Sequence, residues 1–183
     1  MKYLQVDTSI HLESIALSAV PVIFRTIDQD RNYLRKWLPF VDVTISVTDT
    51  ELFVKSLVYN NDRKKDEVFT IWHNLEFAGL IGFKDTDWVN HKTEVGYWLA
   101  EKMQGKGIVT KCMDSLVRYA FNKLKLNRIQ IKVAQGNTKS AAIPARLGFL
   151  LEGTERQGEL LNGYYHNLQI FSLLKSDSYL FSS

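Results

Sequence analysis

The segment Gln104-Gly105-Lys106-Gly107-Ile108-Val109-Thr110 has the residue types of a turn that binds an anion. Glycines just before a helix let the backbone approach a ligand closely, and the first N–H groups of a helix have no partner within it. These N–H groups and the positive end of the helix dipole attract phosphate, and Lys106 and Lys111 add positive charge nearby. The segment therefore predicts a diphosphate site, although short glycine turns also occur for purely structural reasons.

Two better-known phosphate loops do not fit this segment. A dinucleotide-binding fingerprint requires a third glycine near Thr110, which is missing. A P-loop requires Gly-Lys-Ser/Thr after an earlier glycine, whereas Gly107 is followed by Ile108. The sequence therefore fits neither the dinucleotide-binding fingerprint nor the P-loop of nucleoside triphosphatases.

A second polar segment, Asn137-Thr138-Lys139-Ser140, opens a short predicted helix that ends near Gly148. Asn137 is a favoured N-cap, and glycine is the favoured residue just past a helix. Ser140 falls in the first turn, where its hydroxyl can face a ligand lying across the helix start. Pro144 lacks an N–H, so we expect it to kink this helix or to restrict it to its first turns.

Hydrophobic spacing predicts the elements that hold these two segments. Stretches of β-branched and aromatic residues indicate strands, and apolar residues at steps of three and four indicate helices. We expect strands at 11–16, 68–72, 77–83, 93–99, 128–133, 150–159 and 166–174, and helices at 19–38 (in two pieces), from 48 onward, at 109–124 and at 139–147. The three strands between 68 and 99 should form an antiparallel meander. Strands and helices mixed without strict alternation indicate an α+β fold, or an α/β fold with a mixed sheet.

Length and composition indicate one globular domain spanning residues 1–183, with 45% hydrophobic and 23% charged residues. A net charge of +3 with both signs mixed along the chain does not predict nucleic-acid binding. We find no signal peptide and no apolar run of about 20 residues, so we expect a soluble, cytoplasmic protein without membrane contact. The single cysteine, Cys112, is expected in the core, and His73, His91 and His166 lack metal-ligand spacing, so no metal is expected.

The two polar segments together resemble a known family. Gln-x-x-Gly-x-Val at positions 104, 107 and 109 resembles motif A of the GNAT acetyltransferases, Arg/Gln-x-x-Gly-x-Gly/Ala, with valine in place of the usual small residue. Asn137-x-x-Ser140, followed by Leu147-Gly148-Phe149, resembles their motif B. The family resemblance implies the GNAT fold, a central mixed, mostly antiparallel, splayed sheet flanked by helices.

Two further segments are similar to the RimJ/RimL branch, which acetylates N-terminal amines of ribosomal proteins. They are Leu-Arg-Lys-Trp-Leu-Pro-Phe at 34–40 and Glu-Leu-Leu-Asn-Gly-Tyr-Tyr-His at 159–166. The second has one spacer residue fewer than the branch pattern, and Asn167 stands where the branch often has aspartate. With these segments, the resemblance covers nearly the whole chain.

The resemblance implies where acetyl-CoA binds. Its pantetheine arm would pair with the backbone of the strand that ends at Trp98 and Leu99, and would hydrogen-bond to Asn137. Its diphosphate would lie on backbone N–H groups of Gln104, Gly105, Lys106, Gly107, Ile108, Val109 and Thr110.

The resemblance also implies catalytic roles. Ser140 would sit beside the thioester sulfur as a proton donor to the leaving thiolate. An α-amine is mostly protonated at neutral pH, and Glu159 would remove a proton from it through a water. Trp37 and Phe40 would line the acceptor groove, although packing under a loop accounts for them equally well.

The implied function is direct transfer of an acetyl group from acetyl-CoA to a primary amine, foremost the N-terminal amine of a ribosomal protein. Two alternatives stay open: a small amine acceptor (a polyamine, an aminoglycoside or an amino acid), and a non-catalytic acetyl-CoA-binding module. A wide groove between Trp37 and the last strands would favour a peptide acceptor, and a closed acidic pocket would favour a polyamine. Tyr179, Leu180 and Phe181 near the C-terminus are compatible with packing on a second subunit of a homo-oligomer.

Overall fold

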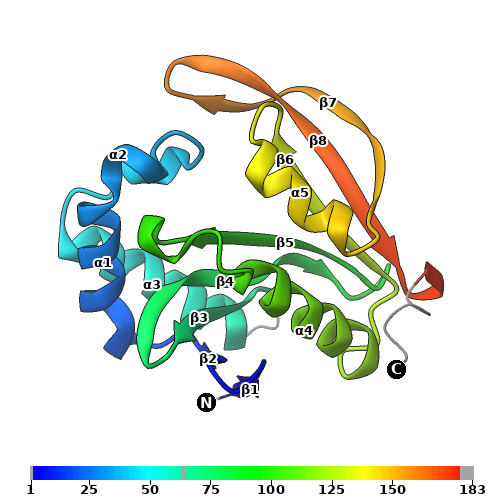
Figure 1. Cartoon of the computed structure of the whole chain (residues 1–183), viewed down its shortest axis with the longest axis horizontal. Helices are drawn as coiled ribbons and strands as arrows, with labels where there is room; N and C mark the ends of the chain where they lie inside the picture. The colour runs from blue at the N-terminus through cyan, green and yellow to red at the C-terminus, as the bar shows by residue number, and fades with distance from the viewer. Residues whose placement is uncertain (1, 63–64, 178–183) are drawn as a thin grey trace.

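One mixed β-sheet runs through the computed structural model, which describes residues 2–62 and 65–177 (Figure 1). Within these residues eight strands pair in the order β1-β2-β3-β4-β5-β6-β8-β7. The strands are β1 (Tyr3–Gln5), β2 (Ile10–Ser14), β3 (Glu67–His73), β4 (Glu76–Asp87), β5 (Lys92–Leu99), β6 (Arg128–Ala134), β7 (Leu150–Leu161) and β8 (Tyr164–Leu174). Neighbours are antiparallel except for β5 and β6. This sheet confirms the predicted mixed, mostly antiparallel architecture. The residues Tyr179, Leu180 and Phe181 lie outside the described part of the chain.

The sheet splays open between β5 and β6. The parallel ladder that joins these strands ends at the pair Glu94↔Gln130. Beyond it, β5 stays paired with β4 as far as Leu99, and β6 stays paired with β8 as far as Ala134. The two halves of the sheet therefore diverge from this point, as the ribbon shows (Figure 1). Backbone groups on the facing edges of β5 and β6 are left without a ladder partner, which a buried strand edge needs.

Helices cover both faces of the sheet (Figure 1). On one face α4 (Ile108–Asn122) packs in a core that includes Val95 of β5. On the other face α1 (Val20–Gln29) and α3 (Val47–Asp62) pack in a second core that includes Trp98 of β5. Odd and even residues of β5 thus serve opposite faces, as the pleat of a strand requires. The other helical segments are η1 (Leu17–Ala19), α2 (Arg31–Leu34), η2 (Pro39–Asp42), η3 (Glu101–Met103) and α5 (Thr138–Arg146). None of the helices described is long and apolar enough to span a bilayer.

The structure corrects the cap predicted for one helix and the effect predicted for Pro144 in another. α3 begins at Val47, because the capping pair is Ser46 and Asp49: the Ser46 N–H donates to Asp49 Oδ2 (2.8 Å) and the Asp49 N–H donates to Ser46 Oγ (3.3 Å). This reciprocal cap lies two residues before Thr48, where the sequence predicts that the helix begins. α5 continues past Pro144 to Arg146, so the proline does not restrict this helix to its first turns.

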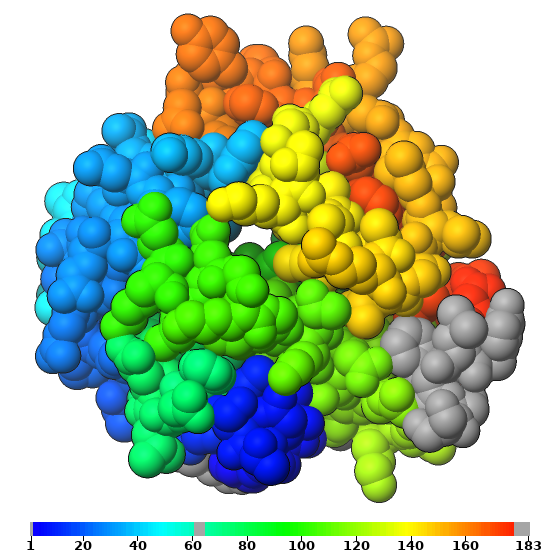
Figure 2. All heavy atoms as spheres, in the orientation of Figure 1, coloured from blue at the N-terminus to red at the C-terminus, as the bar shows by residue number. Residues whose placement is uncertain are grey.

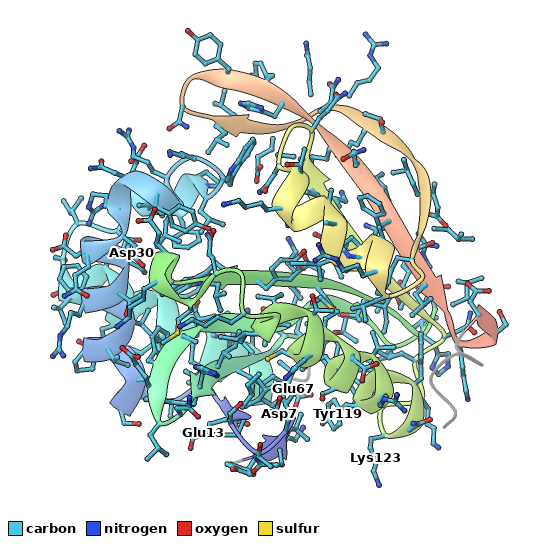
Figure 3. The ribbon with its side chains drawn as sticks, in the orientation of Figure 1. Asp7, Glu13, Asp30, Glu67, Tyr119 and Lys123 are labelled. Atoms are coloured by element: carbon cyan, nitrogen blue, oxygen red, sulfur yellow. The ribbon has the colours of Figure 1, made fainter. Side chains whose placement is uncertain are left out.

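The start of the chain is tied across the sheet by a buried carboxylate. Glu67 opens β3 and is buried, and it forms an ion pair with Lys2. The hydroxyl of Tyr119 on α4 donates to Glu67 Oε1 (3.2 Å), so Glu67 and Tyr119 face each other (Figure 3). A run of charged residues such as 62–67 indicates a solvated loop, but Asp66 and Glu67 at its end are buried. The contact of Glu67 with Lys2 holds β1 in place. The sequence does not predict β1, because its three residues are too few to show the alternation of a strand.

The pairing of β4 with β5 depends on the absence of a side chain at Gly79. A Cβ there would lie 2.1 Å from the carbonyl oxygen of Trp98 on the neighbouring strand. We expect Gly79→Ala to destabilise the protein by about 3 kcal/mol or more, because backbone must move to relieve the overlap. Gly153→Ala on β7 is the control, because nothing lies within 4 Å of a Cβ there. Thermal unfolding should show a lower Tm for the Gly79 variant alone, and equal Tm values for both variants would contradict this view of the splayed strand.

Candidate active site

The N-terminus of α4 presents bare backbone N–H groups. Its N-cap, Gly107, has a left-handed conformation (φ 71°), and no side chain caps the helix. Gly105 is also left-handed (φ 72°). A Cβ at either glycine would meet nothing within 4 Å, so the space beside this turn is open. A diphosphate needs converging N–H donors, open space and the positive end of a helix dipole. The turn from Gln104 to Thr110 fits such a group.

Buried side chains anchor this turn. Ile108 and Val109 point into the core and are 1% and 7% exposed. Val109, which replaces the usual small residue of motif A, therefore directs its bulk away from the open turn. With both side chains fixed, the first N–H groups of α4 are held in place before any ligand binds, which lowers the cost of ordering them.

The lysines that supply positive charge near the turn differ from those expected from the sequence. Lys111 forms an ion pair with Asp7 in the β1–β2 turn (2.7 Å). Its ammonium is therefore already neutralised. Lys139 on α5 instead reaches the turn, donating to Gln104 Oε1 (3.1 Å). This contact joins the two polar segments singled out in the sequence.

The free edge of β5 lies beside this turn. Trp98 is 8% exposed and its side chain stacks edge-on against Phe77 in the second core. Its carbonyl oxygen faces Gly79 on β4, so the backbone groups of Trp98 belong to the ladder with β4 and not to the free edge. Leu99 packs against the other core and is partly exposed. Backbone groups alternate in direction along a strand, so those of Leu99 point into the splay, where an amide-containing chain can pair with them.

Asn137 and Ser140 lie together at the start of α5, as the sequence predicts. The Asn137 side chain caps the helix, with its Oδ1 accepting from the Ser140 N–H (3.2 Å). The Ser140 hydroxyl lies 3.0 Å from the hydroxyl of Tyr97 on β5. Burial raises the pKa of Tyr97 to about 12, and its hydrogen bond with Ser140 opposes this rise. Sequence reasoning missed Tyr97, because a tyrosine in an alternating strand reads as ordinary core.

Glu159 stands apart from this cluster. It lies on β7 directly opposite His166 of β8. Burial raises the pKa of Glu159 above its ordinary value of 4.5, while Lys84 and His166 counteract the rise. Within residues 2–62 and 65–177 its carboxylate has no hydrogen-bond or ion-pair partner. The nearby Glu94, by contrast, pairs with Lys84 (2.7 Å).

Ser140 and Glu159 approach the splay from opposite faces of the sheet. Tyr97, which contacts Ser140, and Glu94, which lies near Glu159, are an odd and an even residue of β5. Their side chains therefore point to opposite faces. Figure 2 shows an opening between the green segment leading into α4, the yellow start of α5 and the blue region around α2. A thioester on one side and an amine on the other could meet there.

Residues 31–45, here called the α2 arm, lie against the start of α5 and the β7–β8 turn. A Cβ at Gly136, just before α5, would lie 3.6 Å from the ring of Trp37. The side-chain amide of Asn162, in the β7–β8 turn, donates to the carbonyl of Arg35 (3.2 Å). Phe40 instead packs against the second core and stacks on the exposed Phe53 of α3 (6.3 Å between ring centroids). Phe40 therefore has a packing role, and Trp37 lies beside the backbone that leads into α5.

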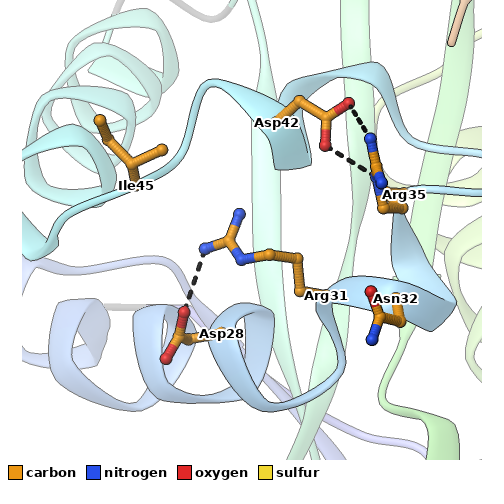
Figure 4. Close-up of a pocket in the computed structure, with 6 residues that line it drawn as sticks. All are labelled: Asp28, Arg31, Asn32, Arg35, Asp42 and Ile45. Atoms are coloured by element: carbon orange, nitrogen blue, oxygen red, sulfur yellow. Dashed lines mark hydrogen bonds and ion pairs between the residues drawn. The ribbon is translucent and has the colours of Figure 1, made fainter.

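Two arginines hold the α2 arm in shape. Arg35 binds Asp42 through two parallel hydrogen bonds (2.9 and 3.0 Å). Arg31 pairs with Asp28 and also donates to backbone carbonyls at Val41 and Thr44. These residues line an open cavity of about 440 Å³ (Figure 4). Both guanidinium groups bind within the protein, and these contacts support the arm. Among the described residues, no cluster of three or more His, Cys, Asp or Glu side chains could hold a metal ion.

Comparison with known proteins agrees with this geometry. A family model of the acetyltransferase (GNAT) domain matches residues 10–150. The chain belongs to the GNAT acetyltransferase family. This GNAT protein is 37% identical over 153 residues to a putative ribosomal N-acetyltransferase, YdaF, of Bacillus subtilis, covering 81% of this chain and 82% of that protein. It is 29% identical to a ribosomal-protein-serine acetyltransferase of Escherichia coli, covering 92% and 94% of the two chains.

A similar protein has been solved with coenzyme A bound. The ribosomal L7/L12 alpha-N-protein acetyltransferase RimL, in complex with coenzyme A, superposes with a TM-score of 0.93 at 26% identity. The match covers 96% of this chain and 99% of that one. The present GNAT protein is thus an N-acetyltransferase that uses acetyl-CoA. When bound, the coenzyme supplies an acetyl group activated as a thioester.

Proposed function

We propose that this acetyltransferase modifies the N-terminal amine of a protein, specifically a ribosomal protein in the cytoplasm. The observation that carries the proposal is the unpaired, partly buried Glu159 carboxylate on the face of the splay opposite Ser140. A carboxylate whose pKa is raised is a better base for an ammonium group than an ordinary surface glutamate. The relatives named for ribosomal-protein acetylation support the same acceptor.

Each residue has a proposed part in the reaction. The N–H groups from Gln104 to Thr110 hold the diphosphate. The end of β5 at Trp98 and Leu99, together with the side chain of Asn137, holds the pantetheine arm. Glu159, through a water, takes a proton from the ammonium group, the neutral nitrogen attacks the acetyl carbonyl carbon, and its remaining extra proton is lost to solvent. The C–S bond then breaks with its electron pair going to sulfur, beside the Ser140 hydroxyl. Much of the rate comes from holding amine and thioester in line.

The charges around Glu159 favour an acceptor with a single positive charge. A polyamine carries several ammonium groups and needs several free carboxylates. Here Glu94 is neutralised by Lys84 and Glu155 by Lys132, each at 2.7 Å. Glu159 is left to receive one ammonium, which is what a peptide N-terminus offers.

The test is thioester consumption with peptides that carry the N-termini of ribosomal proteins. The same peptides with a blocked α-amine are the control, and spermidine is the competing acceptor. We expect turnover with a free α-amine, none with the blocked form, and mass-spectrometric placement of the acetyl group on the N-terminal nitrogen. Faster turnover of spermidine, or acetylation of lysine side chains only, would reject the acceptor assignment.

A further inference from the structure

Tyr97 and Ser140 form a two-point contact across the splay. The Tyr97 hydroxyl lies 3.0 Å from Ser140 Oγ and donates at 3.1 Å to the Ser140 carbonyl oxygen. The Ser140 N–H is bound by the Asn137 side chain. All three polar groups of Ser140 therefore have a partner, and two of them share Tyr97. This is a more specific arrangement than a core tyrosine requires.

The carbonyl of Ser140 is available because of Pro144. In an α-helix this carbonyl would accept from the N–H of residue 144, four positions on. Pro144 has no N–H, yet α5 continues through it to Arg146. The Tyr97 hydroxyl takes the place of the missing donor. The proline thus couples β5 to the first turn of α5.

Counting hydrogens shows that this contact can exist in two forms. Tyrosine and serine hydroxyls each have one hydrogen to donate. In the first form Tyr97 donates to the Ser140 carbonyl and Ser140 donates to the Tyr97 oxygen. In the second form Tyr97 donates to Ser140 Oγ, which frees the serine hydrogen to point elsewhere. Rotation of two hydroxyl groups interconverts the forms without moving any heavy atom.

We propose that Tyr97 is a positioning residue that aims the Ser140 hydroxyl at the leaving sulfur. Before reaction the first form keeps both hydroxyls satisfied. As negative charge develops on sulfur, the second form lets Ser140 donate to it while its own oxygen accepts from Tyr97. A hydroxyl that accepts one hydrogen bond is a stronger donor for the next. No proton needs to leave Ser140, since a thiolate is a stable leaving group compared with an alkoxide.

The inference rests on the proposed place of Ser140 beside the sulfur, and a double-mutant cycle tests it. We expect Tyr97→Phe, which keeps the packed ring, to lower kcat about tenfold, the rate equivalent of about one hydrogen bond. The KM for acetyl-CoA should stay close to that of the wild type, and the Tm should fall by a few degrees because the Ser140 carbonyl loses its donor. In a Ser140→Ala background the same Tyr97→Phe change should cost almost nothing more, because Tyr97 acts through Ser140.

The outcomes separate this inference from the acceptor assignment. The cycle compares ratios of kcat, so it can be run with a peptide or with spermidine, whichever is acetylated. If Ser140→Ala is slow but the two effects multiply, Tyr97 acts independently of Ser140 and the inference is wrong. An unchanged kcat for Tyr97→Phe, or a loss confined to KM, also overturns it. If Ser140→Ala itself leaves kcat unchanged, the proposed role of Ser140 fails along with the inference.

Discussion

Glu159→Gln is expected to lower kcat about 100-fold, the lower end of what a general base contributes. Glutamine keeps the size and shape of the side chain but cannot accept a proton from the attacking amine. The wild-type activity should fall as pH drops through the pKa of Glu159, which burial places above 4.5. The variant should lose this acidic limb of the profile. Steady-state kinetics across pH measures both effects.

The same variant should be more stable than the wild type at neutral pH. A raised carboxyl pKa means that the folded state favours the protonated form, so the charged form lowers stability above the folded pKa. The gain in Tm should therefore grow as pH rises through the pKa of Glu159, and should vanish below about pH 4, where both side chains are neutral. Slower turnover with higher stability is the expected signature of a functional group.

Glu155→Gln is the matched control for this prediction. Glu155 lies on the same strand but is already paired with Lys132. Its replacement should leave kcat and the pH profile close to those of the wild type. A comparable loss of kcat in both variants would show that Glu159 acts through the general charge of the hairpin and not as the base.

Gly107→Val is expected to weaken acetyl-CoA binding about 100-fold. Valine is strongly disfavoured in the left-handed conformation of this residue, and its side chain would occupy the open space beside the N–H groups. Losing one or two hydrogen bonds to a charged diphosphate costs about 3 kcal/mol, which is about a 100-fold rise in Kd. Calorimetric titration with acetyl-CoA measures it directly.

Gly163→Val separates ligand contact from backbone strain. Gly163, in the β7–β8 turn, is also left-handed (φ 82°) and also has nothing within 4 Å of a Cβ. The strain from valine should therefore be similar at the two positions. The Gly163 variant should keep the wild-type Kd for acetyl-CoA, so an equal loss in both variants would point to strain as the cause.

The local conformation of the two polar segments could be predicted from the sequence because it is built from consecutive backbone residues. A turn such as Gln104 to Thr110 and a helix start such as Asn137 to Ser140 are formed by consecutive residues whose types report their conformation. Gly107 is left-handed and Asn137 is an N-cap in the structure, as their types suggest. The spacing between the two segments then follows from one helix and one strand.

The contacts that join distant elements could not be predicted in this way. The partner of Lys111 is Asp7, which lies far away in sequence, and nothing local to either residue signals the pair. Tyr97 meets Ser140 only because the splay brings β5 and α5 together. Pro144 was expected to distort its own helix. It instead leaves the Ser140 carbonyl free to accept a hydrogen bond from Tyr97 on β5. Side-chain chemistry across a sheet depends on packing that a linear pattern does not contain.

A crystal structure of the protein with acetyl-CoA, in the absence of an amine, tests the central claim most directly. We expect the diphosphate to accept hydrogen bonds from backbone N–H groups between Gln104 and Thr110, and the pantetheine arm to pair with the edge of β5 at Trp98 and Leu99. The thioester sulfur should lie within hydrogen-bond reach of Ser140 Oγ, on the face of the sheet opposite Glu159. Coenzyme bound elsewhere, or a sulfur remote from Ser140, would contradict the account.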